Sequence, residues 1–151
     1  MITGFFGEYL WLSNFFACRI EYDGYIYFSV EAAYQAQKFK GTALQERYMK
    51  TIFTKITANE AKILGRMVNL RPDWEEIRDD LMEQLLRKKF IENDTYRDFL
   101  LNTGDEELIE ENTWCDTHFG CCTCPIHNGE GENILGKMIM KLRDELKQKD
   151  N

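Results

Sequence analysis

The segment from Ser29 to Lys38 carries the residues best suited to acid–base or covalent chemistry. A helix would place four of its side chains in one stripe: Glu31, Tyr34, Gln35 and Lys38. Three alanines occupy the other faces, so neighbouring elements can approach the backbone closely. Because an unpaired buried polar group costs about 1 to 3 kcal/mol, the stripe is predicted to face a cleft, where pKa values shift towards neutrality. The alternative is a solvated helix face with an ordinary Glu31–Lys38 ion pair.

A second group of candidate residues lies towards the C-terminus. It runs from Trp114 to Gly120 and continues in a glycine-rich segment, residues 129–137. Glycines before a helix leave backbone N–H groups that can bind an anion, and Lys137 adds a positive charge in the first turn. The segment therefore predicts a phosphate site, although the same pattern also begins many ordinary helices. Three tryptophans are candidate platforms for stacking a base, or else core residues: Trp11, Trp74 and Trp114.

Four of the five cysteines lie close together, with both histidines: Cys115, Cys121, Cys122, Cys124, His118 and His127. An odd total excludes a fully paired disulfide framework, and thiols in a chain without an export signal are expected to be reduced. Structural zinc usually takes two separated ligand pairs, whereas three of these cysteines are nearly consecutive. We therefore expect reduced thiols that pack a tight loop, and neither a metal nor another cofactor. The alternative is an interaction protein built on a zinc knuckle.

Local signals predict the elements that position the first group. Aromatic residues on both sides of Asp23-Gly24 predict a β-hairpin. The pattern then becomes helical, and Ser29 is the expected N-cap of a helix over residues 30–39. A capping box at Thr57 predicts a further helix, with Gly65 near its end.

Three helices are expected in the second half of the chain. The longest is predicted to start at Pro72, and its apolar stripe indicates a core face: Trp74, Ile77, Leu81, Leu85 and Phe90. A short helix over residues 94–101 is closed by Gly104, and a brief strand is predicted at residues 108–110. The last helix carries a similar stripe, before a charged tail at about residues 148–151 that is expected to fray: Ile134, Leu135, Met138, Ile139, Leu142 and Leu146.

Composition bounds the class of protein. The 151 residues are 44% apolar and include only 2 prolines, which favours one folded domain over residues 1–151 and excludes a disordered regulator. The net charge of −7 argues against a broad electrostatic grip on nucleic acid, and no apolar run is long enough to cross a membrane. The expected protein is soluble and cytoplasmic. Its predicted fold is α+β and predominantly helical, with a small N-terminal antiparallel sheet packed on a helical core. The sequence does not indicate the oligomeric state.

Many short motifs follow one another in a recognisable order. In the first half they are Gly7, Ser13-Asn14-Phe15, Asp23-Gly24, Glu31-Ala32-Ala33-Tyr34-Gln35, Lys38, Ala61-Lys62 and Leu64-Gly65-Arg66. In the second half they are Asp73-Trp74, Met82, Lys89-Phe90, Leu101, Thr103-Gly104, Glu110, Asp116, Phe119-Gly120, Asn133, Leu135-Gly136-Lys137 and Met140. Over nearly its whole length the chain thus resembles the NADAR family, also called YbiA-like.

The resemblance implies a hydrolase of N-glycosidic bonds. Family substrates include phosphoribosylated pyrimidine intermediates of riboflavin synthesis and ADP-ribose attached to guanine. The partner would be such a small molecule, with nucleic acid only as the carrier of an ADP-ribosylated base. The implied catalytic residues are Glu31, Lys38 and Asp116. The implied substrate-binding residues are Ser13, Asn14, Tyr34, Gln35, Arg66, Trp74, Trp114, Phe119, Gly120, Asn133, Gly136 and Lys137.

Each catalytic candidate has an expected role. Glu31 would stabilise the cationic sugar or handle the proton, because bond cleavage builds positive charge on the anomeric carbon. Lys38 would attack that carbon and form a transient imine, and Asp116 would orient or deprotonate a reacting group. Phe119 stands where the family often has tryptophan, and the loop after it is rich in cysteine, which leaves the choice of substrate open. The competing interpretation is a catalytically silent module that binds ADP-ribose or a nucleotide.

Overall fold

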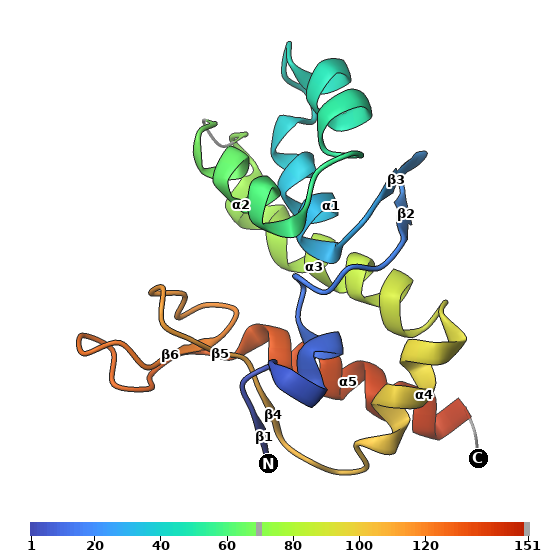
Figure 1. Ribbon diagram of the computed structural model, residues 1–151, viewed down its shortest axis with the longest axis vertical. Coiled ribbons are helices and arrows are strands. Elements are labelled where there is room, and N and C mark those ends of the chain that lie inside the picture. The colour runs from blue at the N-terminus through green and yellow to red at the C-terminus, as the bar shows by residue number, and fades with distance from the viewer. Residues whose placement is uncertain (69–70, 150–151) are drawn as a thin grey trace. The chain divides into compact units, whose positions relative to one another are not determined.

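The protein is described by a computed structural model over residues 1–68 and 71–149 (Figure 1). Its backbone contacts divide the chain into two compact units. The central unit is Asn14–Glu92, and the terminal unit combines Met1–Ser13 with the chain from Asn93 onward. Each unit buries apolar residues of its own. The expectation of one domain over residues 1–151 stays a prediction, and Asp150 and Asn151 lie outside the described residues.

The central unit begins with the predicted hairpin. Strand β2 (Ile20–Tyr22) pairs antiparallel with β3 (Tyr25–Tyr27). Asp23 and Gly24 both adopt positive φ, 52° and 87°, which is the conformation required by the tight turn that matches the twist of a hairpin. This prediction is confirmed.

The helix that carries the candidate stripe is shorter than predicted. Helix α1 (Val30–Ala36) begins as expected, because the Ser29 hydroxyl accepts a hydrogen bond of 2.9 Å from the Ala32 N–H. After Ala36 the chain tightens into a 3₁₀ turn, η2 (Gln37–Phe39). Such tightening is common where an α-helix ends. Lys38 therefore lies in the 3₁₀ turn, outside the α-helix. Its position relative to Glu31 depends on this turn and not on α-helical periodicity.

Two more helices complete the core of the central unit. Helix α2 (Ala58–Arg66) opens with the full capping box at Thr57, as predicted, and α3 (Trp74–Phe90) buries most of the predicted stripe. Ile77 of that stripe is only half-buried. The predicted start at Pro72 is wrong by two residues, because Asp73 occupies the N-cap position. A π-helix, η3 (Glu46–Ile52), was not predicted.

The terminal unit contains most of the short strands. Strand β1 (Ile2–Thr3) pairs parallel with β4 (Leu108–Ile109), and β5 (Glu111–Asn112) pairs parallel with β6 (Cys121–Cys122). The expectation that the sheet is antiparallel and N-terminal therefore holds only for the hairpin, since two parallel pairs lie elsewhere. The helix-rich α+β class itself is confirmed.

Three helical segments accompany these strands. They are the 3₁₀ segment η1 (Gly7–Leu12), α4 (Asp94–Asn102) and α5 (Ile134–Lys149). Helix α5 buries much of its predicted stripe, with Leu135, Ile139, Leu142 and Leu146 inside and Ile134 and Met138 half-buried. Because α5 continues to Lys149, the first two residues of the expected frayed tail are helical. Within the described part of the chain, every helix is too short or too polar to span a membrane.

Candidate functional site

Glu31 is a buried carboxylate in the first turn of α1. It is 8% exposed, and its Oε1 accepts a hydrogen bond of 2.8 Å from Gln35 Nε2, one turn later. The Glu31 N–H donates to the carbonyl of Asn14 at 3.1 Å, which ties the start of the helix to the residue that follows η1. The carboxylate is therefore fixed by its own helix, with the charge largely removed from water.

Lys38 is a half-buried charge of the central unit. Its Nζ lies 3.3 Å from the carbonyl of Gly65 and 5.6 Å from the centre of the Trp74 ring. Burial lowers the pKa of Lys38 below its usual value, and the Glu31 carboxylate opposes that shift. Two guanidinium groups, Arg66 and Arg78, lower the pKa of Lys38 further. The amine is thus easier to deprotonate than an exposed lysine, which is the property that a nucleophilic amine needs.

Gly65 explains how α2 reaches the candidate stripe. Helices α1 and α2 lie side by side (Figure 1). A Cβ on Gly65 would lie 1.9 Å from Gln35 Oε1, so only glycine fits against this amide. The same close approach brings the Gly65 carbonyl to Lys38. Gly65 was predicted only as a residue near the end of a helix; its role in the stripe needs the three-dimensional packing.

Two buried acceptors near Glu31 lack hydrogen-bond partners among the described residues. They are Gln35 Oε1 and Asn14 Oδ1. The Gln35 amide nitrogen is used on Glu31, and the Asn14 Nδ2 lies 3.5 Å from the sulfur of Met82. Buried polar atoms are nearly always paired, so these two acceptors are exceptions in the packing around α1.

The other predicted residues of the central unit take different positions. Trp74 is 3% exposed and packs against Tyr34, with ring centres 5.0 Å apart. Both rings are buried, so Trp74 is a core residue in this packing, and its predicted stacking on a base stays a prediction. Arg66, in contrast, is exposed in the last turn of α2.

A hollow of about 260 Å³ lies elsewhere in the central unit. Its walls include Gln37, Arg71 and Gln84. Neither Glu31 nor Lys38 lines it, so it does not supply the cleft that the sequence predicts for the stripe. That cleft stays a prediction.

In the terminal unit, Asp116 organises the turn that follows β5. Its Oδ1 accepts hydrogen bonds from the N–H groups of His118, at 3.1 Å, and Phe119, at 3.0 Å. The side chain is half-buried. A carboxylate in this arrangement is held in one orientation and keeps its second oxygen for another partner.

The predicted phosphate cradle at the start of α5 is not formed. The N–H groups of Ile134 and Leu135 donate to the carbonyls of His118 and Phe119, at 3.1 and 2.9 Å. The preceding N–H, that of Asn133, donates to the carbonyl of Gly120 at 3.4 Å. These amides were expected to be free for an anion, and the prediction is wrong because the loop folds back to cap the helix.

Three predicted binding residues have structural functions in the terminal unit. The buried Asn133 side chain accepts from the Glu110 N–H at 3.0 Å and donates to the Leu108 carbonyl at 2.9 Å. A Cβ on Gly136 would lie 2.2 Å from that same carbonyl, and one on Gly120 would lie 1.8 Å from Glu110 Oε2. The asparagine and both glycines therefore bring the loop and α5 against the strands. A role in substrate binding for these three stays a prediction.

The remaining predicted residues of the terminal unit stay candidates. Trp114 is 45% exposed, and Lys137 is also exposed. Phe119 is half-buried with its ring against His118. Trp11 packs with Phe99, with ring centres 5.5 Å apart, and the half-buried Ser13 ends η1. Trp114 is thus the most accessible of the three predicted stacking residues.

The structure brings together two of the three predicted catalytic residues. Glu31 and Lys38 belong to the central unit, and the charge of one affects the pKa of the other. Asp116 belongs to the terminal unit, so its action together with the other two stays a prediction. Arg78, which affects the pKa of Lys38, was not among the predicted residues, because nothing in the sequence links α3 to this amine.

The loop cysteines are closer in space than their spacing suggested. Four side chains converge, with ligand atoms all within 4.8 Å of one another: Cys115, Cys122, Cys124 and His127. The argument from spacing against a shared site is therefore wrong, because the chain reverses between these residues.

Known proteins that match this chain are enzymes and biosynthetic proteins. The N-glycosidase Npun_R5314 of Nostoc punctiforme is 36% identical over 137 residues, which cover 89% of this chain and 84% of the relative. The riboflavin biosynthesis protein VVA0006 of Vibrio vulnificus is 36% identical over 139 residues, 91% of this chain but only 35% of that longer protein.

A solved structure and a family model agree with these matches. The NMR structure of the Escherichia coli protein YbiA superimposes with a TM-score of 0.78 at 29% identity, covering 99% of this chain and 87% of that one. The model of the NADAR domain matches residues 5–147. The chain therefore belongs to the NADAR domain family.

Proposed function

We propose that this protein is an N-glycosidase that hydrolyses the bond between a base and a phosphoribosyl or ADP-ribosyl group. The observation that carries the proposal is the buried Glu31 carboxylate next to the half-buried Lys38 amine, whose pKa is lowered by burial. Two relatives support the proposal, because their alignments cover more than four-fifths of this chain and their names specify an N-glycosidase and a riboflavin biosynthesis protein. A ribosylaminopyrimidine phosphate is therefore the first substrate to test.

The charges suit the reaction. Breaking the glycosidic bond leaves positive charge on the anomeric carbon, and the buried Glu31 carboxylate stabilises it more strongly than an exposed one would. The exposed Arg66 is the candidate for the phosphate.

Lys38 would act as the nucleophile. Its neutral amine attacks the anomeric carbon, and the C–N bond to the base breaks with its electron pair going to the base, which takes up a proton. Loss of the amine proton and opening of the ring oxygen bond give an imine, which water hydrolyses to release the sugar and restore the amine. The complete cycle returns Lys38 to its starting state.

The first experiment measures release of base by mass spectrometry from a ribosylaminopyrimidine phosphate and from ADP-ribosylated guanosine. We expect release by the wild type and a rate about 10² to 10⁴ lower for Glu31→Gln, which keeps the shape but removes the charge. Glu76→Gln, an exposed residue on α3, is the matched control and should keep the full rate. Tight binding of either compound without release would show a binding module and contradict the proposal.

A second experiment tests Lys38 separately. Borohydride added during turnover should reduce the imine and leave the sugar attached to Lys38, where peptide mass spectrometry locates it. Lys38→Arg keeps the positive charge and should show neither adduct nor turnover. Full activity of Lys38→Arg together with an absent adduct would reduce Lys38 to a charge that holds the substrate, and would leave the role of Glu31 intact.

A further inference from the structure

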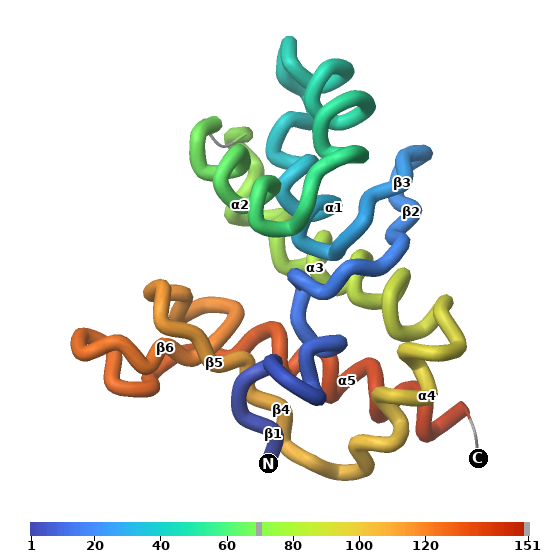
Figure 2. The backbone as a smooth tube through the Cα atoms, viewed as in Figure 1, coloured from blue at the N-terminus to red at the C-terminus, as the bar shows by residue number. Residues whose placement is uncertain are grey.

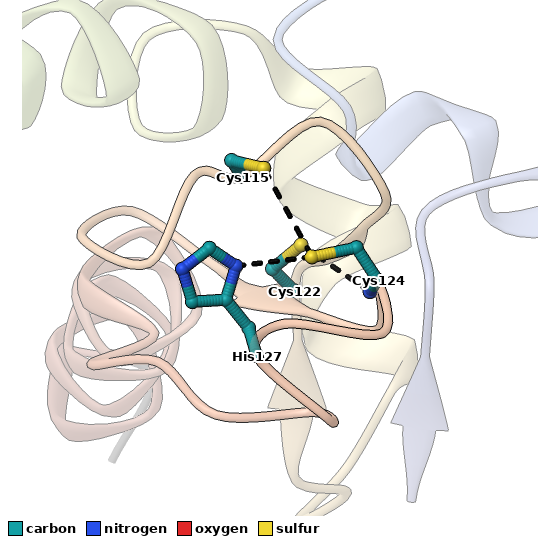
Figure 3. A group of neighbouring side chains, drawn as sticks. All are labelled: Cys115, Cys122, Cys124 and His127. Atoms are coloured by element: carbon teal, nitrogen blue, oxygen red, sulfur yellow. Dashed lines mark hydrogen bonds between the residues drawn. The ribbon is translucent and has the colours of Figure 1, made fainter.

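The loops around β5 and β6, orange in Figure 2, contain a cluster of side chains that the proposed reaction does not use. Cys115, Cys122, Cys124 and His127 point towards one another (Figure 3), and their ligand atoms all lie within 4.8 Å of one another. We propose that these four residues bind one structural zinc ion in a tetrahedral site of three thiolates and one imidazole.

The distances fit such a site. With zinc–sulfur bonds of about 2.3 Å and zinc–nitrogen bonds of about 2.0 to 2.1 Å, a tetrahedron separates two sulfurs by about 3.8 Å and a sulfur from the nitrogen by about 3.6 Å. The Sγ atoms of Cys115 and Cys124 are 3.9 Å apart. The Sγ of Cys124 is 3.1 Å from His127 Nδ1, so this pair needs to open by a few tenths of an ångström to admit the ion.

The backbone holds each ligand in place. Cys122 lies on β6, and the Cys124 N–H lies 3.4 Å from its sulfur, an arrangement that stabilises a thiolate. A turn carries the chain from Cys124 to His127, closed by the His127 N–H on the Cys124 carbonyl at 3.1 Å. The chain then returns to β6, because the Gly129 N–H donates to the Cys122 carbonyl at 2.7 Å.

Cys115 comes from the other side of the loop. Its backbone is in the left-handed region, with φ of 68°, which is unfavourable for most residues other than glycine and asparagine. The buried Asn112 fixes this conformation, since its Oδ1 accepts from the N–H groups of Trp114 and Asp116, both at 3.2 Å, and its Nδ2 donates to the Asp116 carbonyl at 2.8 Å. The turn therefore holds the Cys115 thiol towards the other ligands.

The donor set selects zinc by its chemistry. Three soft thiolates and one imidazole in a closed tetrahedron are typical of structural zinc sites, whereas hard cations prefer oxygen. Binding releases the three thiol protons to solvent while the ion accepts four donor bonds, with no change of oxidation state. All four ligands come from the protein, so the ion is not available to activate water.

The loop supplies its own matched controls. Cys121 neighbours Cys122 on β6, but its sulfur lies 3.7 Å from the Gly131 carbonyl and outside the cluster. His118 pairs instead with the Glu132 carboxylate, with Nδ1 and Oε2 2.9 Å apart. These two residues resemble the proposed ligands in type and sequence position but should not bind the ion.

The experiment measures metal content by mass spectrometry after purification without affinity metals or chelators. We expect about one zinc per chain in the wild type and in Cys121→Ser and His118→Ala, and loss of the zinc in Cys122→Ser, Cys124→Ser and His127→Ala. A folded wild type without zinc overturns the proposal. So does an intact mass that shows a disulfide among these cysteines, or zinc that persists in all three ligand variants.

A measurement on the wild type covers the case in which a ligand variant fails to fold. A mercurial reagent that blocks thiols should release the zinc into a coloured indicator, and cobalt added to the metal-free chain should give the strong ligand-field and thiolate charge-transfer bands of a tetrahedral site. Weak bands of octahedral cobalt would contradict the site. Neither readout uses glycosidase activity, so the zinc proposal and the proposed function fail independently.

Discussion

Lys89 shows what burial does to a charge that has no evident part in the chemistry. It is 1% exposed in α3, and its Nζ lies over the rings of Phe16 and Phe90, 5.7 and 5.0 Å from their centres. Loss of solvation lowers the pKa of Lys89 to about 8, and the neighbouring Cys18 opposes the shift. Lys38 experiences the same effect, so a lowered lysine pKa alone does not identify a nucleophile.

The buried amine of Lys89 predicts a dependence of stability on pH. Between about pH 8 and the usual lysine value of 10.5, the unfolded chain holds this proton and the folded chain has lost it. The free energy of unfolding contributed by Lys89 therefore rises with pH across this window, by roughly 3 kcal/mol in total. Below about pH 8 the amine is charged in both states, and its burial costs the full penalty.

The test is urea unfolding of the wild type and Lys89→Met at several pH values across the window. We expect Lys89→Met to be the more stable protein near pH 8 and its advantage to shrink as the pH rises. Lys88→Met, at a partly exposed position where the lysine pairs with Glu92, is the control and should follow the wild type. A constant difference between wild type and Lys89→Met at all pH values would show that the amine is charged throughout.

The contact between α1 and α2 depends on the absence of one side chain. Gly65→Ala would place a methyl group 1.9 Å from Gln35 Oε1, and Gln35 is the residue that holds the Glu31 carboxylate. We expect a loss of unfolding free energy of roughly 1 to 3 kcal/mol from overpacking, together with a lower rate of base release. Ile63→Ala, at an exposed position of the same helix, should change neither quantity by a comparable amount. An unaltered Gly65→Ala protein would mean that α2 moves freely against α1.

The link between β4 and α5 rests on one buried amide. Asn133→Ala removes its two hydrogen bonds to the Glu110 N–H and the Leu108 carbonyl and forces alanine into a φ of 53°. Asn128 has nearly the same φ, 52°, but is exposed, so Asn128→Ala measures the backbone cost alone. We expect Asn133→Ala to lose roughly 2 to 4 kcal/mol more than Asn128→Ala in chemical unfolding, because two buried backbone groups lose their partners. Equal losses would show that water replaces the amide.

Elements set by neighbouring residues were predictable from the sequence. The Asp23-Gly24 turn, the Ser29 cap and the Thr57 capping box each depend on contacts within a few positions, and all three are confirmed. Features that join distant segments were not predictable. Strands β1 and β4 form a parallel pair, although they lie more than a hundred positions apart in the sequence (Ile2 pairs with Leu108). The pattern of residues in neither strand indicates its partner.

The same distinction explains the corrections at the candidate sites. The glycine-rich approach to α5 looked like an anion site, because the sequence does not show that the carbonyls of His118 and Phe119 return to its amides. The cysteine spacing looked unsuitable for zinc, because the sequence does not show the reversal that brings Cys115 to Cys124. Glu31 and Lys38 do interact electrostatically, although the turn η2 and not a continuous helix positions the amine, and their catalytic roles stay a prediction.

Asp116 belongs to the terminal unit, and its expected role in the reaction gives the last prediction. Its Oδ1 accepts two backbone hydrogen bonds, and the amide oxygen of asparagine can accept the same two. Asp116→Asn therefore removes the charge but keeps the turn, and it should alter the unfolding free energy by less than about 1 kcal/mol. If the carboxylate handles a proton, base release should fall at least roughly 10²-fold.

Kinetics of the double variant then show whether the terminal unit serves the same step as the central one. When two residues act in the same step, substituting both lowers the rate by less than the product of the two separate fold-reductions. We therefore expect the rate of Glu31→Gln with Asp116→Asn to lie well above that product, while Asp98→Asn, exposed on α4, leaves the rate of Glu31→Gln unchanged. Multiplicative losses would place the two carboxylates in independent steps. Full activity of Asp116→Asn would show that the Asp116 carboxylate has no part in the reaction. Its function would then be structural, because its two backbone hydrogen bonds shape the turn between Cys115 and His118.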